Sequence, residues 1–363
     1  MGGSYILIYT GFFIFCIVVA LMLNGLFLRF SRNLGIRVDG DLIRWSSTQK
    51  PSLGGITFFF LFLISVAAYS IFFPYKLLPL DKPMLGVLGS VTLAFLMGLA
   101  DDAYNTKPLL KFAVQCLCGL IVANTGFVIS LFDHDYLNTI LTILWVVAMM
   151  NSINMLDNMD AITAVVSLFI LFQAFMILYL HEDYFNAHVI IIVGVSGALL
   201  GFLFYNWHPS RLFMGDTGSQ FLGIVLAILG IKYFWNDPYA IAGDVPWTKK
   251  IICVSISFLI PIADTVTVVI NRLLRKSSPF IGGKDHTTHH LSYLGLSDSQ
   301  VAMVYAGISI VSTLLIVIIQ KSIAVWATKY ALVFGAYVVV IGGTLYAITK
   351  YSKPPVKEDE KKG

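Results

Sequence analysis

The stretch LNTILTILWVVAMMNSINMLDNMD, residues 137–160, joins a long apolar run to a ladder of polar side chains. On a helix, a spacing of three places two amides and two carboxylates along one slowly drifting face. Ionisable groups next to hydrocarbon are expensive and usually functional, so the ladder indicates a site at the end of a membrane span more than a solvated helix cap. The four oxygen-bearing residues are Asn151, Asn154, Asp157 and Asp160.

The composition of the chain is that of a polytopic membrane protein. Of its 363 residues, 58% are hydrophobic and 12% are charged, and the mean hydropathy is +0.82. A spanning helix needs roughly 20 apolar residues. We therefore expect an all-α integral membrane protein with about eleven transmembrane helices, at residues 5–28, 53–73, 84–100, 109–131, 137–155, 161–180, 187–205, 218–235, 250–271, 301–320 and 323–349.

The distribution of Lys and Arg between the loops predicts the orientation. With the N-terminus outside, 17 of the 24 basic residues fall on one side of the membrane, which should be the cytoplasmic side. The C-terminus is then cytoplasmic, and residues 350–363, with mixed charge and two prolines, should form a disordered tail. The net charge of +4 reflects this topology, and we do not interpret it as nucleic-acid binding.

A pair of carboxylates closes the third apolar segment, in GLADDAYNTKPLLKF at residues 98–112. Adjacent helical residues point about 100° apart, so Asp101 and Asp102 should differ in role. One could bind or activate while the other orients. A solvated loop beside Lys111 is the alternative. In the first loop, Lys50 is a candidate for a phosphate contact.

The segment FYNWHPSRLFMGDTGSQFLG, residues 204–223, is the most specific in the chain. Its glycines allow close backbone approach, and the N-terminus of the helix that follows favours an anion such as phosphate. Asp216 would then be a metal ligand, since Mg²⁺ takes one or two carboxylates together with substrate phosphates. A capping Asp is the alternative.

Three histidines lie in the loop RKSSPFIGGKDHTTHHLSYLG, residues 275–295. A transition-metal site is conceivable, but the spacing is not that of a zinc site. Donors for phosphate oxygens fit better. With the N-terminus outside, all the polar segments fall on the cytoplasmic face, which implies one site there for an anionic substrate and a metal. These segments are 29–55, 101–111, 151–160, 206–219 and 272–290.

These segments resemble the polyprenyl-phosphate N-acetylhexosamine-1-phosphate transferases, the family of MraY, WecA and TagO, and most closely its WecA/TagO branch. LADDAYNTKPLLKF resembles the family's DD segment, and FMGDTGS resembles its FMGDxGS. NSINMLDNMDAI resembles NxxNxxDGxDG, with Asn158 and Ala161 in place of the glycines. KDHTTHHL resembles the His-rich loop but lacks the HxHH or HHH order, because Thr287 stands where the first histidine would align.

The resemblance implies a single transmembrane catalytic domain, residues 1–349, in the bacterial plasma membrane, with its active site on the cytoplasmic face. It implies transfer of an N-acetylhexosamine 1-phosphate, most often GlcNAc-1-phosphate, from a UDP-sugar to undecaprenyl phosphate. The products are a lipid-linked diphospho-sugar and UMP, in the first membrane step of a cell-envelope glycan pathway. Mg²⁺ is the expected cofactor, with Mn²⁺ as an alternative.

The resemblance also implies roles for individual residues. Asn154 and Asp216 would hold the metal, and Asp101 and Asp102 would handle the lipid phosphate. The uridine pocket would comprise Asp160, Asn206 and Phe213, supported by Asp157. The residues that would contact phosphates are Lys50, Lys111, Arg272, His286, His289 and His290.

Two other functions stay open at this stage. An MraY-type enzyme would take a UDP-muramyl peptide, and the absence of an HHH run argues against it. A transporter of an anionic solute would place its polar residues near the bilayer midplane in broken helices, whereas these carboxylates lie at the ends of spans. The identity of the N-acetylhexosamine, the downstream polymer and a homodimer are all left open.

Overall fold

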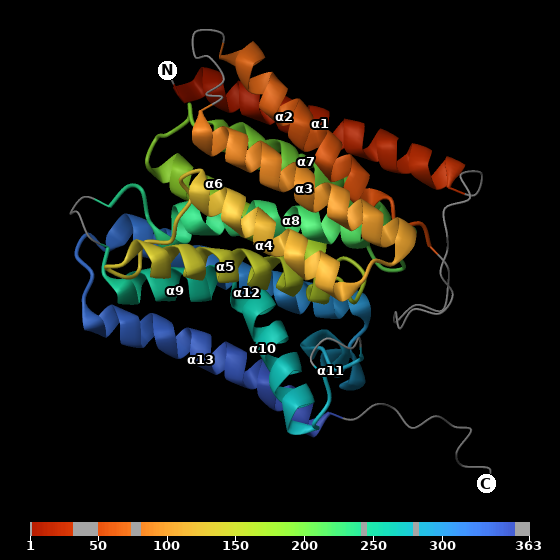
Figure 1. The fold of residues 1–363 in the computed structure, drawn as a ribbon, viewed down its shortest axis with the longest axis vertical. Helices are drawn as coiled ribbons and strands as arrows, with labels where there is room; N and C mark the ends of the chain where they lie inside the picture. Colours follow the sequence, from red (N-terminus) through yellow and green to blue (C-terminus); the bar gives the residue numbers. More distant parts are fainter. Residues whose placement is uncertain (1, 32–49, 74–80, 241–244, 279–282, 353–363) are drawn as a thin grey trace.

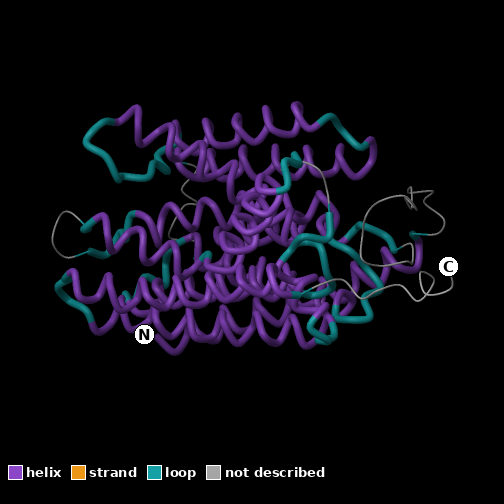
Figure 2. Tube along the Cα trace, turned by 90° about the horizontal axis from the view of Figure 1, so that it is seen from below, coloured by secondary structure: helices purple, strands orange, loops and turns teal. Residues whose placement is uncertain are grey.

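The computed structural model describes the chain except residues 1, 32–49, 74–80, 241–244, 279–282 and 353–363. The described residues form helices and loops only, which confirms the all-α class (Figure 2). In chain order the helices are α1 (Gly2–Phe30), α2 (Gly54–Phe72), α3 (Lys82–Tyr104), α4 (Pro108–Asn124), α5 (Asp135–Leu156), α6 (Ile162–Leu180), α7 (Ala187–Asn206), α8 (Gly215–Leu229), the π-helix η1 (Gly230–Trp235), α9 (Trp247–Ser257), α10 (Leu259–Leu274), α11 (Thr287–Tyr293), α12 (Asp298–Ser322) and α13 (Thr328–Tyr351).

Helix α8 lies at the centre of the bundle (Figure 1). It packs against α2, α3 and α5, and every one of its residues except Asp216 is buried. A helix that is apolar all round is stable only when other helices surround it. The end of α8 that begins at Gly215 therefore presents a single polar side chain, that of Asp216.

Two glycines bring the neighbouring backbones close to α8. A Cβ atom on Gly98 of α3 would lie 2.4 Å from the Asp216 carbonyl oxygen, and one on Gly223 of α8 would lie 2.6 Å from the Met150 Cα of α5. Small residues at such crossings let membrane helices approach closely. These contacts fix the ends of α3 and α5 beside the first turn of α8.

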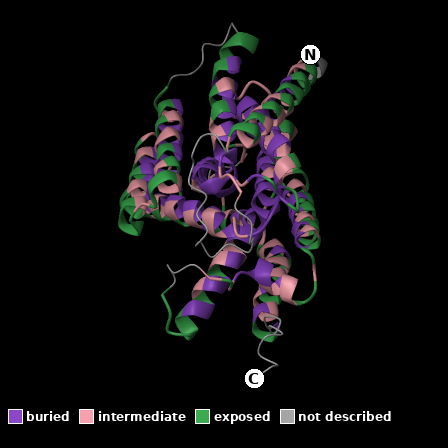
Figure 3. Ribbon diagram, turned by 90° about the vertical axis from the view of Figure 1, so that its right-hand side faces the viewer, coloured by how far each residue is buried: buried purple, intermediate pink, exposed green. Residues whose placement is uncertain are grey.

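The outer surface of the bundle is apolar, as expected for a protein surrounded by lipid. Leu7 of α1 is 75% exposed, and Leu332 and Val339 of α13 are each 71% exposed. Figure 3 shows buried residues gathered along the inner helices and exposed ones on the outer faces. Because a soluble protein would leave few such patches uncovered, the structure supports a multi-pass membrane protein.

The spans agree with the sequence in position but differ in number. Among the described residues, nine helices are long and apolar enough to cross a bilayer, or ten if the bent pair α9–α10 is one span. The predicted segment 109–131 contains α4, which ends at Asn124 before a turn at Gly126, where φ is 110°. A count of eleven therefore stays a prediction that depends on this shorter helix.

The predicted span 250–271 is broken instead of continuous. Helices α9 and α10 meet at Phe258 and are bent by 84°. Pro261 explains the break, because proline has no N–H to donate to the carbonyl of Ser257 and its ring would clash with that carbonyl. Proline is tolerated in a first turn, which is where Pro261 lies in α10.

Candidate active site

Asp102 caps the first turn of α8. Its carboxylate accepts hydrogen bonds from the backbone N–H of Asp216 at 2.9 Å and of Thr217 at 2.8 Å, and from the Thr217 hydroxyl at 2.6 Å. A carboxylate satisfies these otherwise unpaired amides and interacts favourably with the helix dipole. We expected these amides to be available to a phosphate, but in the structure Asp102 takes them. Of the two adjacent carboxylates, Asp102 is therefore the one that orients.

Asp101 is paired with Lys111. Its carboxylate accepts from the Lys111 ammonium at 2.9 Å, and from the backbone N–H and hydroxyl of Thr106 at 2.9 and 2.5 Å. The same ammonium lies 3.3 Å from Asp216 Oδ1. Lys111 thus bridges carboxylates of α3 and α8, and one cation balances part of their charge.

Asn154 brings α5 to the same point. Its side-chain amide donates to Asp216 Oδ1 and to the Ser219 hydroxyl, the latter at 2.8 Å. The two ends of an amide are nearly indistinguishable, and a rotated Asn154 would present its oxygen toward Asp216. A carboxylate and an amide oxygen are hard ligands of the kind that Mg²⁺ takes. Asp216 is the accessible member, because 29% of its side chain is exposed.

The four-residue ladder does not form one helical face, and this part of the prediction is wrong. Helix α5 ends at Leu156, so Asp157 and Asp160 lie in the turn that follows it. Asn151 instead donates to the Gln115 amide oxygen at 2.7 Å and joins α4 to α5. The turn ends at Ala161, whose φ of 68° is incompatible with a continuing right-handed helix.

Asp160, in the turn after α5, forms a second polar cluster with residues of the loop between α7 and α8. Its carboxylate accepts from the Ser210 hydroxyl at 2.7 Å and the Ser210 backbone N–H at 3.0 Å, and it lies 3.0 Å from His208 Nδ1. Lys50 donates to the Ser210 hydroxyl at 2.9 Å, and its ammonium lies 5.1 Å from the centroid of the Phe213 ring. The structure thus places three predicted substrate residues together: Lys50, Asp160 and Phe213.

Asn206 is buried, and its side chain bonds to two backbone groups. Its side-chain oxygen accepts from Ala161 N–H, and its side-chain nitrogen donates to the Leu212 carbonyl, both at 2.9 Å. It therefore ties the turn after α5 to the loop before α8. Asn206 therefore holds together the two segments that form the predicted uridine pocket.

The histidine loop is anchored on Asp264, a buried carboxylate of α10. Asp264 lies 2.8 Å from His286 Nδ1, and it accepts from the backbone N–H and hydroxyl of Thr287 at 2.8 and 2.6 Å. The Thr287 hydroxyl also contacts the Tyr305 hydroxyl at 2.6 Å. Thr287, which departs from the family's histidine pattern, thus serves to hold α11 in place.

The charged side chains of the histidine loop pair with one another around Asp285. The Arg272 guanidinium donates to Asp285 at 2.8 Å, and Arg275 adds a second contact at 3.1 Å. Burial alone would raise the pKa of Asp285, but its pairing with the two arginines outweighs burial and leaves that pKa below its usual range.

Burial lowers the pKa of His289 to about 3, so this imidazole is uncharged at neutral pH.

The histidine loop also contacts the turn after α5. The Thr288 hydroxyl donates to the Asn158 side-chain oxygen at 2.6 Å. Asn158 replaces a glycine of the family pattern, and Thr288 follows Thr287, the residue that departs from the histidine pattern. Together with the contacts above, this bond brings the described parts of all five polar segments to one end of the bundle, where His290 also contacts Ser352 at 2.7 Å.

Comparison with known proteins identifies the segment that carries most of these residues. Residues 84–234, from α3 to the end of η1, match glycosyl transferase family 4. This segment contains the carboxylates and amides of α3, α5 and α8, whereas the histidine loop and α12 lie outside the matched residues.

Three proteins that are similar to this chain have related names. A probable undecaprenyl-phosphate N-acetylglucosaminyl 1-phosphate transferase of Bacillus subtilis is 24% identical over 287 residues, which are 77% of this chain and 76% of that protein. A phospho-N-acetylmuramoyl-pentapeptide-transferase of Leptospira biflexa is 50% identical over 56 residues, 15% of each chain. A decaprenyl-phosphate N-acetylglucosaminephosphotransferase of Mycolicibacterium smegmatis is 28% identical over 132 residues, 35% of this chain and 32% of that protein.

Three polar residues near the site were not predicted from the sequence. His208 and Asp298 are brought together only by the packing of the α7–α8 loop on α12. Asp264 lies inside the predicted span 250–271. An ionisable residue within a membrane span indicates function, so the sequence did contain a signal for Asp264. Its partners lie in a loop that is distant in sequence.

Proposed function

We propose that the protein transfers an N-acetylhexosamine 1-phosphate, in the first instance GlcNAc-1-phosphate, from a UDP-sugar to undecaprenyl phosphate. The products are a lipid-linked diphospho-sugar and UMP. The observation that carries this proposal is the convergence of Asp101, Lys111, Asn154 and Asp216 from four helices at one end of an apolar bundle. A membrane-embedded acceptor and an anionic, water-soluble donor both have access to such a place. The names of the relatives support the same reaction class.

The donor set at Asp216 fits a divalent cation. Asp216 is the only accessible residue of α8, and Asn154 contacts its carboxylate directly. We propose that these two residues hold Mg²⁺, with Mn²⁺ as an alternative. When bound, the ion supplies electrostatic stabilisation of the charge on a diphosphate.

Direct attack by the lipid phosphate is the simplest chemistry for this arrangement. A phosphate acceptor already carries its oxyanion, so no side chain has to remove a proton from it. Lys111 can balance the charge of the phosphate groups, and Asp101 fixes the position of the Lys111 ammonium at 2.9 Å. Asp102 holds the start of α8 and thereby positions Asp216.

The second polar cluster and the histidine loop provide candidates for the rest of the donor. Phe213 offers a ring beside Lys50 for the base, and Arg272 offers a cation held by Asp285. We assign the choice of sugar to the 272–295 loop, because it departs most from the family pattern and contacts the turn after α5 through Thr288.

The test is transfer by the purified chain in detergent, with undecaprenyl phosphate and a panel of labelled UDP-sugars. Formation of UMP together with a lipid-linked product from UDP-GlcNAc is the expected result. Product with UDP-GalNAc alone would change the donor while leaving the reaction class intact. UMP release that does not depend on undecaprenyl phosphate, or no product with any donor, would refute the proposal.

A second candidate is the MraY-type reaction. The 50% identity to a phospho-N-acetylmuramoyl-pentapeptide-transferase over 56 residues favours it. The donor panel therefore includes UDP-N-acetylmuramoyl-pentapeptide. Faster transfer from this donor than from UDP-GlcNAc would select the second candidate.

A further inference from the structure

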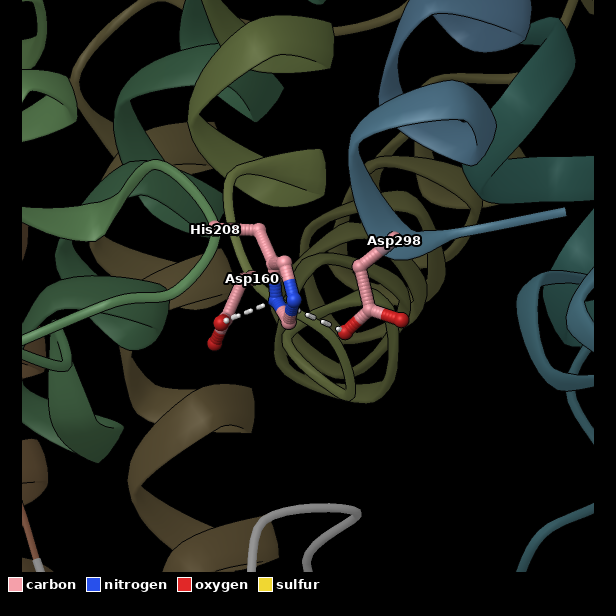
Figure 4. A group of neighbouring side chains, drawn as sticks. All are labelled: Asp160, His208 and Asp298. Atoms are coloured by element: carbon pink, nitrogen blue, oxygen red, sulfur yellow. Dashed lines mark hydrogen bonds and ion pairs between the residues drawn. The ribbon is translucent and has the colours of Figure 1, made fainter.

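Three side chains of the types that bind metal ions meet at a second place in the bundle. Asp160, His208 and Asp298 come from the turn after α5, the α7–α8 loop and the first turn of α12 (Figure 4). One ligand atom from each lies within 4.8 Å of the other two. Both carboxylates are buried, with 8 and 11% of their side chains exposed, whereas 42% of the imidazole is exposed.

The two distances from His208 in this cluster match those between neighbouring ligands of one metal ion. His208 Nδ1 lies 3.0 Å from Asp160 Oδ2 and 3.4 Å from Asp298 Oδ2. Metal bonds of about 2.1 Å, at angles between octahedral and tetrahedral, separate neighbouring ligand atoms by roughly 3.0–3.4 Å. Simple hydrogen bonding accounts for the arrangement less well, because Nδ1 carries at most one proton and faces two carboxylate oxygens.

Asp298 is the residue that most requires a further partner. It is 8% exposed, and among the described residues His208 is the only side chain recorded in an ion pair or hydrogen bond with it. A buried carboxylate is costly unless it is paired or coordinates a metal. A dication bound by all three side chains would satisfy Asp298 and leave the exposed side of His208 open to water or a further ligand.

Asp160 has the support expected of a metal ligand. Ser210 holds both of its oxygens, with the hydroxyl on Oδ1 and the backbone N–H on Oδ2. Ligating carboxylates are usually hydrogen-bonded in this way by a second layer of residues. The Lys50 ammonium lies 3.9 Å from Asp160 Oδ2 and is itself held by its hydrogen bond to the Ser210 hydroxyl at 2.9 Å.

We propose that Asp160, His208 and Asp298 form a second divalent-cation site, distinct from the one proposed at Asp216. One imidazole and two carboxylates suit a transition-metal dication such as Mn²⁺ or Zn²⁺ better than Mg²⁺, which prefers oxygen ligands. The site joins α12 to the α7–α8 loop. It does not depend on the proposed transferase activity, because binding requires neither substrate.

The test uses Mn²⁺ as the probe and requires no turnover. Purified full-length protein in detergent is stripped of metal, titrated with Mn²⁺, and measured by pulsed electron paramagnetic resonance. Imidazole nitrogen coupling to Mn²⁺ reports this site alone, because the site proposed at Asp216 has no histidine ligand. We expect the coupling in the wild type, and its loss in His208→Gln. Asp298→Asn, which keeps the shape of the side chain, should weaken Mn²⁺ binding at this site more than tenfold.

Two variants serve as controls. Asp216→Asn should lose any Mn²⁺ bound at the other site and retain the imidazole coupling. His290→Gln removes a histidine at the same end of the bundle, which contacts Ser352, and should also retain the coupling. Absence of the coupling in the wild type, or its persistence in both His208→Gln and Asp298→Asn, overturns the proposal. Loss of the coupling in His290→Gln alone would assign it to the histidine loop and overturn the proposal equally.

Discussion

Asp216 combines accessibility and charge in a way that no other residue of α8 does. Removing its charge in Asp216→Asn, or the amide in Asn154→Ala, should lower Mg²⁺-dependent transfer more than a hundredfold, because each removes a proposed oxygen ligand. The matched control is Asn151→Ala, one turn earlier on α5, where the amide bonds to Gln115. It should keep most of the activity. Turnover with unchanged Mg²⁺ dependence in both site variants would contradict the metal assignment.

Ala161 adopts a backbone conformation that glycine tolerates better. Its φ is 68°, and it is 1% exposed at the start of α6. A left-handed conformation costs a residue with a Cβ roughly 1–2 kcal/mol, part of which glycine loses again through the greater entropy of the unfolded chain. Ala161→Gly should therefore stabilise the protein by about 0.5–1 kcal/mol, seen as a higher midpoint of thermal unfolding. Ala164→Gly, inside α6, should lower that midpoint. Equal losses in both would show that Ala161 carries no strain.

At the scale of elements, the first turn of α8 depends on a residue of α3. Asp102→Ala removes the acceptor for two backbone amides and should destabilise the protein by about 1 kcal/mol, in addition to slowing transfer. Asp101→Asn leaves that cap intact and should slow transfer with a smaller effect on unfolding. Thermal unfolding and steady-state kinetics measured on the same samples separate the two. An unchanged unfolding midpoint in Asp102→Ala would show that the cap is energetically unimportant.

Helix α11 should make stability depend on pH. The folded pKa of His289 is about 3, below the value near 6.5 expected when the chain is unfolded. In this range the unfolded chain binds more protons, so the contribution of His289 is fully present above about pH 6.5 and is lost as pH falls toward 3. We expect roughly 1 kcal/mol of loss per pH unit between pH 6 and 4. His289→Gln should reduce this slope when unfolding is followed across that range. Asp285, whose folded pKa is lowered, also loses stabilisation as pH falls toward 4. The difference in slope between the wild type and His289→Gln therefore reports the contribution of His289.

Elements whose identity follows from local sequence were predicted well, and those set by packing were not. Helix α6 was expected at 161–180 and spans Ile162–Leu180, since a predominantly apolar run of this length needs no tertiary information. The break between α9 and α10 was missed, although Pro261 marks it, because the apolar run continues through it. The pairs Asp264–His286 and His208–Asp298 join segments distant in the chain, and a single sequence carries no record of which helix faces which.

At the scale of the whole molecule, the start of α1 and the end of α13 lie at opposite ends of the bundle. Near the start of α1, Tyr9 contacts the carbonyl of Tyr184, which follows α6 at the end away from the site. At the end of α13, Ser352 contacts His290 of the histidine loop. Figure 1 shows α1 starting on the left of the bundle and α13 running from left toward right. An odd number of crossings produces this arrangement, and it requires α4 or an equivalent element to complete the count.

The excess of Lys and Arg then predicts which end faces the cytoplasm. Since 17 of the 24 basic residues would lie on the side of the site, that side should be cytoplasmic and the N-terminus external. Reporter fusions at Gly2 and Gly363 should therefore show activity in opposite compartments, with the C-terminal one inside. A fusion in the loop before Lys82 should agree with the N-terminal one. Both ends in one compartment would mean an even number of crossings, and would require one of the eleven predicted segments to turn back without crossing.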